Sequence, residues 1–337
     1  MTTPKTDSNY QLDELNFETT LGAYGDEIDA EIPLIDVSDF DLRRDEIRDQ
    51  LWTAAIEVGF FQLKNHSIPQ PKIDNAFECS QAFFQQPLNV KQQYPLKSKL
   101  NAGWEYKAQV RPSTGTADEK ESYQISLPHM EGLWPEQTQP EFKPTMLDFE
   151  WQCWQLGMKV LSCFAEKLGF EHDFFTRAHD RTQADYQNTL RLLHYLPIKE
   201  DAALDQNSWR AGAHTDFDCL TMVFQKEGQG GLQACAGKDA RNGVLQWADV
   251  KPIAGVITCN IGDMLMRWSD DQLKSTLHRV CMPKPDEPKK SRYSLAYFCQ
   301  ANKSAIIQGP EKRYDPISAE DYLRLRIEAN FSKGPTD

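Results

Sequence analysis

The spacing of hydrophobic and polar residues divides the chain into two parts near residue 186. In the first part, apolar residues recur at helical spacing in "LRRDEIRDQLWTAAIEVG" (42–59) and in "PTMLDFEWQCWQLGMKVLSCFAEKL" (144–168). Residues 70–96 show a similar spacing. The pattern therefore predicts three helices, the first of which ends at Gly59, a residue suited to a helix C-terminus.

Shorter segments connect these helices. "IPLID" (32–36) and "FFQLKN" (60–65) predict strands on either side of the first helix. Residues 98–140 contain several prolines and scattered glycines, so the sequence predicts a long loop of the kind that often serves in binding. Residues 1–30 are predicted to be an extended or partly disordered lead.

After residue 186, short β-rich runs alternate with Gly, Asp, Asn and Pro turns, and a helix is predicted from Ser318 onward. This pattern is typical of an all-β barrel or jelly roll. The runs are "TLRLLHYL", "CLTMVFQ", "GLQA", "GVITCNIGDMLMRW", "TLHRV" and "RYSLAYFC".

Composition narrows the class of protein. The chain has 337 residues and a formal net charge of −13, which disfavours the basic surface that binding to nucleic acid requires. It contains no apolar run of 18 residues and no signal peptide pattern, so we expect a cytoplasmic protein without a membrane anchor. Its eight cysteines form no C-x-x-C pair, which argues against a zinc knuckle. The length does not decide between one domain and two.

The stretch "AGAHTDFDCLTMVFQ" (211–225) carries the first candidate chemistry. In a strand, His214 and Asp216 would lie on one face and could form part of a metal site. With seven histidines and 50 acidic residues, however, about one H-x-[DE] pair is expected by chance. His129 and Glu131 fit the same pattern in a proline-rich segment. The pair alone is therefore weak evidence.

Residues further along the chain strengthen this interpretation. His278 lies in the strand-like run "STLHRV", and Arg292 and Ser294 follow in "RYSLAYF". Two histidines and one carboxylate can occupy one face of an octahedron around Fe(II) and leave three positions open. The planar guanidinium of an arginine can then hold the far carboxylate of a bound dicarboxylate. Taken alone, Arg292 is more simply explained by an ion pair at the rim of the predicted barrel.

At this point the chain resembles the Fe(II)/2-oxoglutarate-dependent dioxygenase superfamily, in the branch that includes isopenicillin N synthase and plant flavonoid oxygenases. "VGFFQLKNHSIP", "FFQQP" and "KESYQI" are similar to the N-terminal region of that family, and "HTD", "NIGDML", "LHRV" and "RYSLAYF" to its catalytic core. The nearest likeness is to fungal thymine 7-hydroxylases and to fungal oxygenases of secondary metabolism. The resemblance implies a mostly β fold, a double-stranded β-helix (jelly roll) with flanking α-helices.

The resemblance also assigns roles to residues. Tyr195 matches the tyrosine of an Asn-Tyr-Pro segment in the family, but here His194 replaces the asparagine and Leu196 separates the tyrosine from Pro197. The R-x-S pair also occurs in members that do not consume 2-oxoglutarate. The implied iron ligands are His214, Asp216 and His278, and the implied contacts to 2-oxoglutarate are Arg292, Ser294 and Tyr195.

Substrate contacts are predicted from strand alternation. If Tyr195 faces the iron, Arg191 does so too, and a buried arginine needs an anionic or hydrogen-bonding partner that the substrate could supply. A similarly placed arginine in thymine 7-hydroxylases supports this role, and a loop carboxylate is the alternative partner. Phe298 shares a face with Arg292 and could form a wall against a flat ring. Phe217 is a further candidate, and both phenylalanines could equally be core residues.

The resemblance implies an oxidoreductase that uses Fe(II), 2-oxoglutarate and dioxygen, with ascorbate as a candidate reductant. The expected substrate is a small aromatic or heterocyclic molecule, oxidised at a C–H bond by hydroxylation or by a rearrangement such as ring expansion. The expected regions are 31–140 (N-terminal), 184–302 (catalytic jelly roll) and 303–337 (C-terminal helical extension). Two alternatives remain open: a cupin-like metalloprotein with non-redox activity, although the usual H-x-H pair is missing, and a non-catalytic relative that binds a small molecule.

Overall fold

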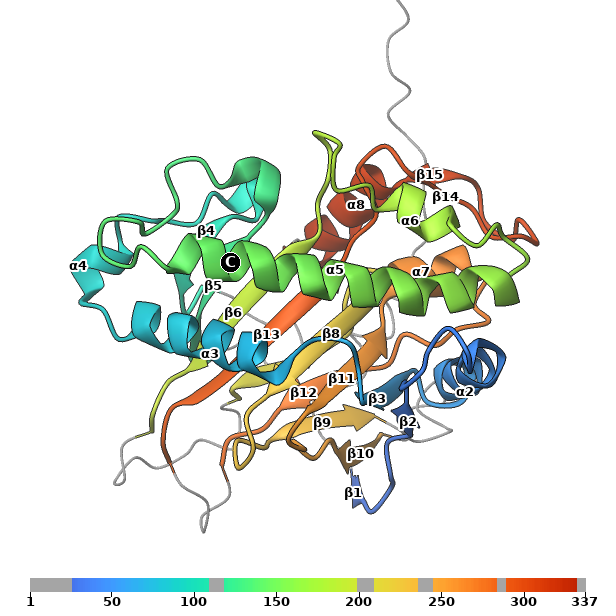
Figure 1. Cartoon of the computed structure of the whole chain (residues 1–337), viewed down its shortest axis with the longest axis horizontal. Coiled ribbons are helices and arrows are strands. Elements are labelled where there is room, and N and C mark those ends of the chain that lie inside the picture. Colours follow the sequence, from blue (N-terminus) through green and yellow to red (C-terminus); the bar gives the residue numbers. More distant parts are fainter. Residues whose placement is uncertain (1–25, 109–117, 199–208, 236–244, 284–288, 332–337) are drawn as a thin grey trace, which may run out of the picture.

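Two facing β-sheets form the centre of the molecule (Figure 1). The computed structural model describes residues 26–108, 118–198, 209–235, 245–283 and 289–331. The larger sheet has the order β2 (Leu34–Asp36), β3 (Phe60–Lys64), β11 (Val256–Ile261), β8 (Leu220–Gln225), β13 (Arg292–Cys299), β6 (Thr189–Tyr195), β5 (Lys120–Ile125) and β4 (Gly103–Tyr106). The smaller sheet has the order β1 (Asp26–Ile28), β10 (Gln246–Asp249), β9 (Leu232–Cys235), β12 (His278–Val280) and β7 (Ala211–His214).

The alternation of side chains along each strand gives the larger sheet two apolar faces. On β6, Leu193 and Tyr195 pack in the cluster between the two sheets, whereas Leu190 and Leu192 belong to the core on the outer side. Ala296 on β13 lies in the inner cluster with them. Because successive residues of a strand point to opposite faces, each strand serves both clusters. The arrangement is the double-stranded β-helix that the sequence predicts.

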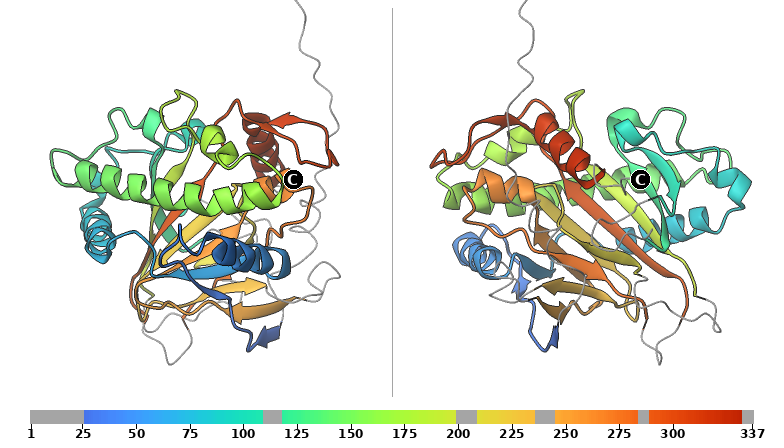
Figure 2. Two further views of the ribbon diagram at one scale, coloured as in Figure 1. Left: turned by 45° about the vertical axis from the view of Figure 1, so that its right-hand side comes forward. Right: turned by 180° about the vertical axis from the view of Figure 1, so that it is seen from behind.

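Helices cover the outer face of the larger sheet (Figure 2). The long helix α5 crosses β13 and β8, where Phe149 meets Phe224 with ring centroids 5.0 Å apart. α3 packs beside α5 and contacts β6 and β13. The helices are α2 (Arg44–Glu57), α3 (Gln70–Phe84), α4 (Leu88–Lys91), α5 (Phe142–Lys167), α6 (Phe174–Ala178), α7 (Asp263–Trp268) and α8 (Ala319–Phe331), with a small sheet of β14 (Ile306–Ile307) and β15 (Ile317–Ser318).

The predicted helices are confirmed, with α2, α5 and α8 close to the expected ranges. Gly59 follows α2 with φ +77°, and a Cβ there would lie 2.4 Å from the carbonyl oxygen of Lys274, so only glycine fits. The predicted helix over 70–96 is divided at Pro87, which separates α3 from α4 because proline disfavours helical backbone in the residue before it. The run "GVITCNIGDMLMRW" forms strand β11 and then helix α7.

The prediction of a long loop over residues 98–140 is wrong in part. β4 and β5 lie in this range and pair with each other, and β5 pairs with β6 from Lys120 opposite Tyr195 to Ile125 opposite Leu190. The local sequence does not predict these strands, because Pro and Gly surround them. Their stability depends on pairing with β6, a strand distant in sequence. Residues 109–117 lie outside the described residues.

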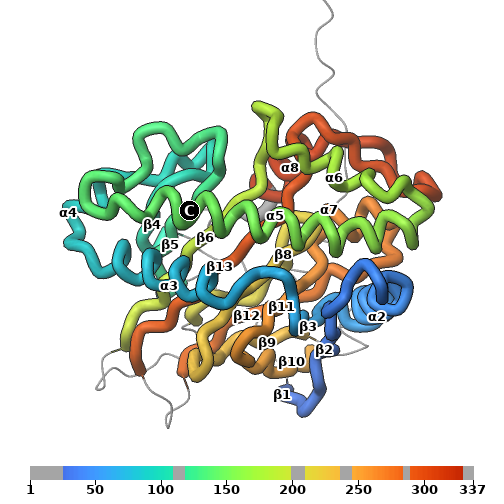
Figure 3. The backbone as a smooth tube through the Cα atoms, in the orientation of Figure 1, coloured from blue at the N-terminus to red at the C-terminus, as the bar shows by residue number. Residues whose placement is uncertain are grey.

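Strands from the N-terminal half join those of the C-terminal half in one sheet. Figure 3 shows that β2 and β3 lie on one flank of β11, β8, β13 and β6, and that β5 and β4 lie on the other. The division of the chain into regions 31–140, 184–302 and 303–337 stays a prediction. All eight cysteines are free thiols. Within the described ranges, every helix is too short or too polar to cross a membrane.

Candidate active site

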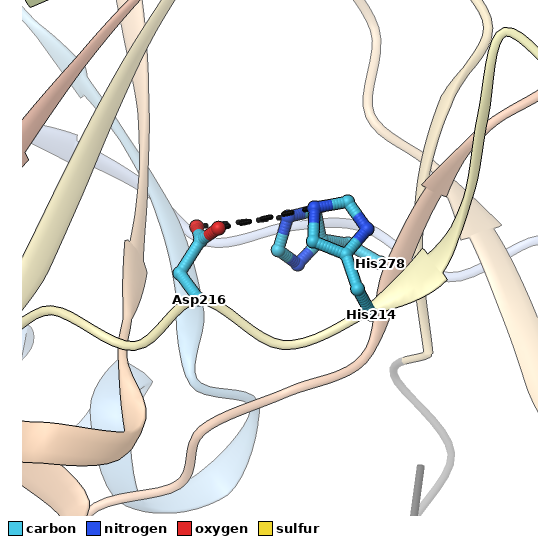
Figure 4. Close-up of side chains that lie close together, drawn as sticks. All are labelled: His214, Asp216 and His278. Carbon is cyan, nitrogen blue, oxygen red and sulfur yellow. Dashed lines mark ion pairs between the residues drawn. The ribbon is translucent and has the colours of Figure 1, made fainter. Parts of the chain in front are cut away.

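Strands β7 and β12 bring two histidines together at one end of the barrel. His278 pairs directly with His214, and their ring centroids are 4.3 Å apart (Figure 4). Asp216 follows the end of β7, and its carboxylate oxygens lie 3.9 Å from Nε2 of His214 and 3.6 Å from Nε2 of His278. One donor atom from each residue lies within 4.8 Å of the others. The predicted set of two histidines and one carboxylate therefore meets in space.

The way in which Asp216 reaches this group differs from the prediction. β7 ends at His214, so Asp216 does not share a strand face with it. Instead, Oδ2 of Asp216 accepts hydrogen bonds from Oγ1 of Thr221 (2.6 Å) and Nδ2 of Asn260 (2.8 Å). These two donors come from adjacent strands of the larger sheet and hold the carboxylate toward the histidines.

Backbone carbonyls orient both imidazole rings. Nδ1 of His214 lies 2.7 Å from the oxygen of Gly212, and Nδ1 of His278 lies 3.3 Å from that of Thr276. A ring whose Nδ1 proton is shared with a carbonyl keeps the lone pair of Nε2 for another partner. Both Nε2 atoms face Asp216, so the donor set fits a cation at this position. His129, the residue of the chance pair, lies in a short 3₁₀ helix (Leu127–His129) and does not join the group.

Arg292 lies at the start of β13, with 2% of its surface exposed. Its Nε donates to the carbonyl oxygens of Gln229 (3.0 Å) and Gly230 (2.9 Å), and Nη2 donates to Oε1 of Gln225 (3.1 Å). Among the described residues, its hydrogen-bond partners are all neutral. Burial lowers the pKa of Arg292, and Tyr195 opposes this effect, but a guanidinium stays charged at neutral pH. A buried cation without a facing carboxylate calls for an anion.

The other two residues implied for 2-oxoglutarate lie beside this arginine. Nη1 of Arg292 donates to Oγ of Ser294 at 3.4 Å, and the guanidinium carbon lies 4.7 Å from the ring centroid of Tyr195. Tyr195 is opposite Arg292 in the pairing of β6 with β13. The departure at His194 has a structural reason, because this side chain points to the other face of β6, where Nδ1 meets Glu121 at 2.8 Å.

The three residues predicted to contact substrate fall into two places. On the inner face, the guanidinium carbon of Arg191 lies 5.1 Å from the ring centroid of Phe298, so these two residues form one surface. Phe217 follows Asp216 in the loop after β7. The guanidinium carbon of Arg326, on α8, lies 4.8 Å from the ring centroid of Phe217. All three predicted residues are partly buried, whereas Arg326 is fully buried.

Several residues that support the site carry no signal in the sequence. Thr221 and Asn260 hold Asp216, but nothing in "CLTMVFQ" or "NIGDML" marks them as different from other strand residues. Arg326 and Asp263, each fully buried, form an ion pair, and Oγ1 of Thr215, between the predicted ligands, donates to Asp263 at 3.0 Å. Nη2 of Arg326 also donates to Oγ1 of Thr215, so these contacts join α8 to the loop that carries Asp216.

Comparisons with known proteins agree with this geometry. Residues 32–145 match the family described as non-haem dioxygenase in morphine synthesis N-terminal, and residues 187–301 match the 2OG-Fe(II) oxygenase superfamily. The UPF0676 protein C1494.01 of Schizosaccharomyces pombe is 32% identical over 90% of this chain and 93% of its own length. The 2-oxoglutarate-Fe(II) type oxidoreductase hxnY of Emericella nidulans is 31% identical over 82% of each chain.

A solved structure is similar over the same extent. The full-length thymine 7-hydroxylase of Neurospora crassa, in complex with alpha-KG and thymine, is 32% identical and covers 92% of this chain and 100% of its own, with a TM-score of 0.79. Because the match covers almost the whole chain, the resemblance inferred from sequence motifs holds for the fold as well. This chain belongs to the 2OG-Fe(II) oxygenase superfamily and is an Fe(II)- and 2-oxoglutarate-dependent oxidoreductase.

Proposed function

We propose that this enzyme oxidises a C–H bond of a small, flat aromatic or heterocyclic molecule, with Fe(II) held by His214, Asp216 and His278. The observation that carries the ligand assignment is the approach of their three donor atoms to within 4.8 Å of one another. The set of two imidazoles and one carboxylate suits Fe(II) in oxygenases. When bound, the iron and 2-oxoglutarate supply the oxidation: the co-substrate loses CO2 to become succinate, and one oxygen atom of O2 enters the other substrate.

We assign the far carboxylate of 2-oxoglutarate to Arg292. The buried guanidinium offers the counter-charge, and its described hydrogen-bond partners leave it without a carboxylate. Ser294 and Tyr195, which lie against it, add hydroxyl donors. These residues would bind and orient the co-substrate, while the apolar side chains of the inner cluster exclude water from it.

The substrate class rests on the surface that Arg191 and Phe298 form. An aromatic ring under a guanidinium offers a flat apolar wall and a hydrogen-bond donor to the same ligand. The thymine bound in the Neurospora crassa structure is a flat heterocycle of this kind. Phe217 is assigned to the opposite end of the substrate, beside Asp216. The choice between hydroxylation and rearrangement depends on the placement of the substrate carbon at ångström scale.

The test is an anaerobic titration of the purified protein with Fe(II) and 2-oxoglutarate, followed by the visible charge-transfer band that chelation by a keto acid produces. We expect the band in the native protein and no band in His214→Ala. Succinate release on addition of O2 then allows candidate substrates to be screened. If iron binds without the band, the assignment of Arg292 and its neighbours to 2-oxoglutarate is wrong, and if iron does not bind, the ligand assignment is wrong.

A further inference from the structure

The inner face of the larger sheet continues past Arg191 onto the strands β5 and β4. Thr221, which donates to Asp216, pairs with Phe298, and Phe298 lies under Arg191. Arg191 pairs in turn with Gln124 on β5. Cross-strand partners lie on the same face of a sheet, with Cβ atoms about 5 Å apart. A continuous row of neighbours therefore leads from a proposed iron ligand to Gln124.

Gln124 has a buried amide that is only half satisfied. Its side chain is 1% exposed, and Nε2 donates to Oε1 of Glu105 (2.8 Å) and to Oγ of Ser122 (3.2 Å). Its Oε1 is buried and has no hydrogen-bond partner among the residues that the structure describes. A buried acceptor without a partner destabilises the folded protein. Such a group in a folded protein calls for an explanation.

The orientation of this amide is fixed by its neighbours. Glu105 is 9% exposed, and its Oε1 also accepts from Oγ of Ser122 at 2.6 Å. If the amide of Gln124 were turned around, its oxygen would face the acceptor oxygen of Glu105, which an ionised carboxylate cannot tolerate. Glu105 therefore holds the amide with Nε2 toward itself and leaves Oε1 as the acceptor available to another group.

We propose that Oε1 of Gln124 accepts a hydrogen bond from a ring N–H of the substrate. This inference deepens the proposed function and rests on it. A lactam or cyclic imide places an N–H beside a C=O, so its N–H would meet Gln124 while its C=O meets the guanidinium of Arg191 and its plane lies on Phe298. Three strand spacings of about 4.8 Å separate β8 from β5, a span suited to one or two rings once side chains fill part of it. A carboxylate substrate has no donor to offer to Oε1 of Gln124.

The experiment uses the full-length protein loaded anaerobically with Fe(II) and 2-oxoglutarate. The probes are uracil, thymine and 2-quinolone, each beside its N-methyl counterparts, and binding is followed by the perturbation of the charge-transfer band. We expect at least one N–H ring to perturb the band and its N-methylated form to bind at least tenfold more weakly. Gln124→Met keeps the length of the side chain and removes the acceptor, so it should abolish this preference.

A matched control completes the design. Gln50→Met, on the exposed side of α2, should change nothing. Because Gln124→Met also removes the donor to Glu105 and Ser122, its far-UV circular dichroism and its charge-transfer band with Fe(II) and 2-oxoglutarate are measured first, to show that it is folded and loaded. If the band forms but no N–H ring perturbs it, or if Gln124→Met leaves the preference intact, the inference is overturned while the proposed function stands. If the band does not form, both the inference and the proposed function are wrong.

Discussion

Arg292→Leu is expected to weaken binding of 2-oxoglutarate far more than it weakens folding. Hydrogen bonds to charged groups are worth about 1.5–3 kcal/mol, so loss of one such bond to the co-substrate should raise its Kd roughly 10- to 150-fold. The substitution has two opposing effects on the free energy of unfolding. The variant leaves the carbonyls of Gln229 and Gly230 without their donor, but it also removes a buried cation whose described partners are neutral. We expect the free energy of unfolding without 2-oxoglutarate to change by no more than about 2 kcal/mol.

The stabilisation that 2-oxoglutarate gives to the folded protein provides a second measure. A ligand present at 100 times its Kd stabilises the folded state by about 2.7 kcal/mol. If the Kd rises 100-fold, the same concentration equals the Kd, and the stabilisation falls to about 0.4 kcal/mol. The melting temperature of Arg292→Leu, measured anaerobically with Fe(II), should therefore respond little to a concentration of 2-oxoglutarate that clearly raises that of the native protein.

The assay is the anaerobic titration of the charge-transfer band with 2-oxoglutarate, run beside the melting curves. Arg313→Leu is the matched control, because this arginine is 57% exposed and pairs with Asp271 away from the site. Its Kd should equal that of the native protein. A Kd for Arg292→Leu within threefold of the native value, in protein that is folded and binds iron, would refute the assignment of Arg292 to the far carboxylate.

Three other perturbations test the site and its support. His278→Ala should abolish binding of Fe(II) as measured by metal analysis after anaerobic dialysis, with the far-UV circular dichroism unchanged; retained stoichiometric iron would contradict the ligand set. Arg326→Leu removes the buried cation that faces Asp263 and should lower the free energy of unfolding by about 3–5 kcal/mol in urea, whereas a loss under 1 kcal/mol would show that the ion pair is dispensable. Burial alone would raise the pKa of Glu121, but hydrogen bonds from His194, Lys91 and Trp104 outweigh it and hold the pKa below its usual value. The stability that Glu121 contributes is thus present above its unfolded pKa and is lost as the pH falls through the lower folded pKa. Glu121→Gln should therefore flatten the acid limb of melting temperature against pH, and an unchanged slope would argue against this role.

The sequence predicted the elements whose signals are local. Helices α2 and α5 were predicted because apolar residues at helical spacing fall within one continuous segment, and the end of α2 was predicted from Gly59. β4 and β5 were missed because β4 pairs with β5, and β5 depends in turn on β6, which lies elsewhere in the chain. The same distinction applies to the site. A short motif marked His214 and Asp216, but no local signal marked the end of β7 at His214 or the hydrogen bonds that hold the carboxylate of Asp216 near His278.

The sequence by itself determined which chemistry the chain carries: the order of His214, Asp216, His278 and Arg292 and the β-rich runs around them were enough to predict a jelly-roll oxygenase. Only the tertiary structure decided how these groups are surrounded. Among the described residues, Arg292 is buried with neutral partners and Oε1 of Gln124 has no partner, because strands far apart in the sequence pair in one register. Hydrogen bonds and burial depend on that register, and a one-residue shift would turn every side chain to the other face.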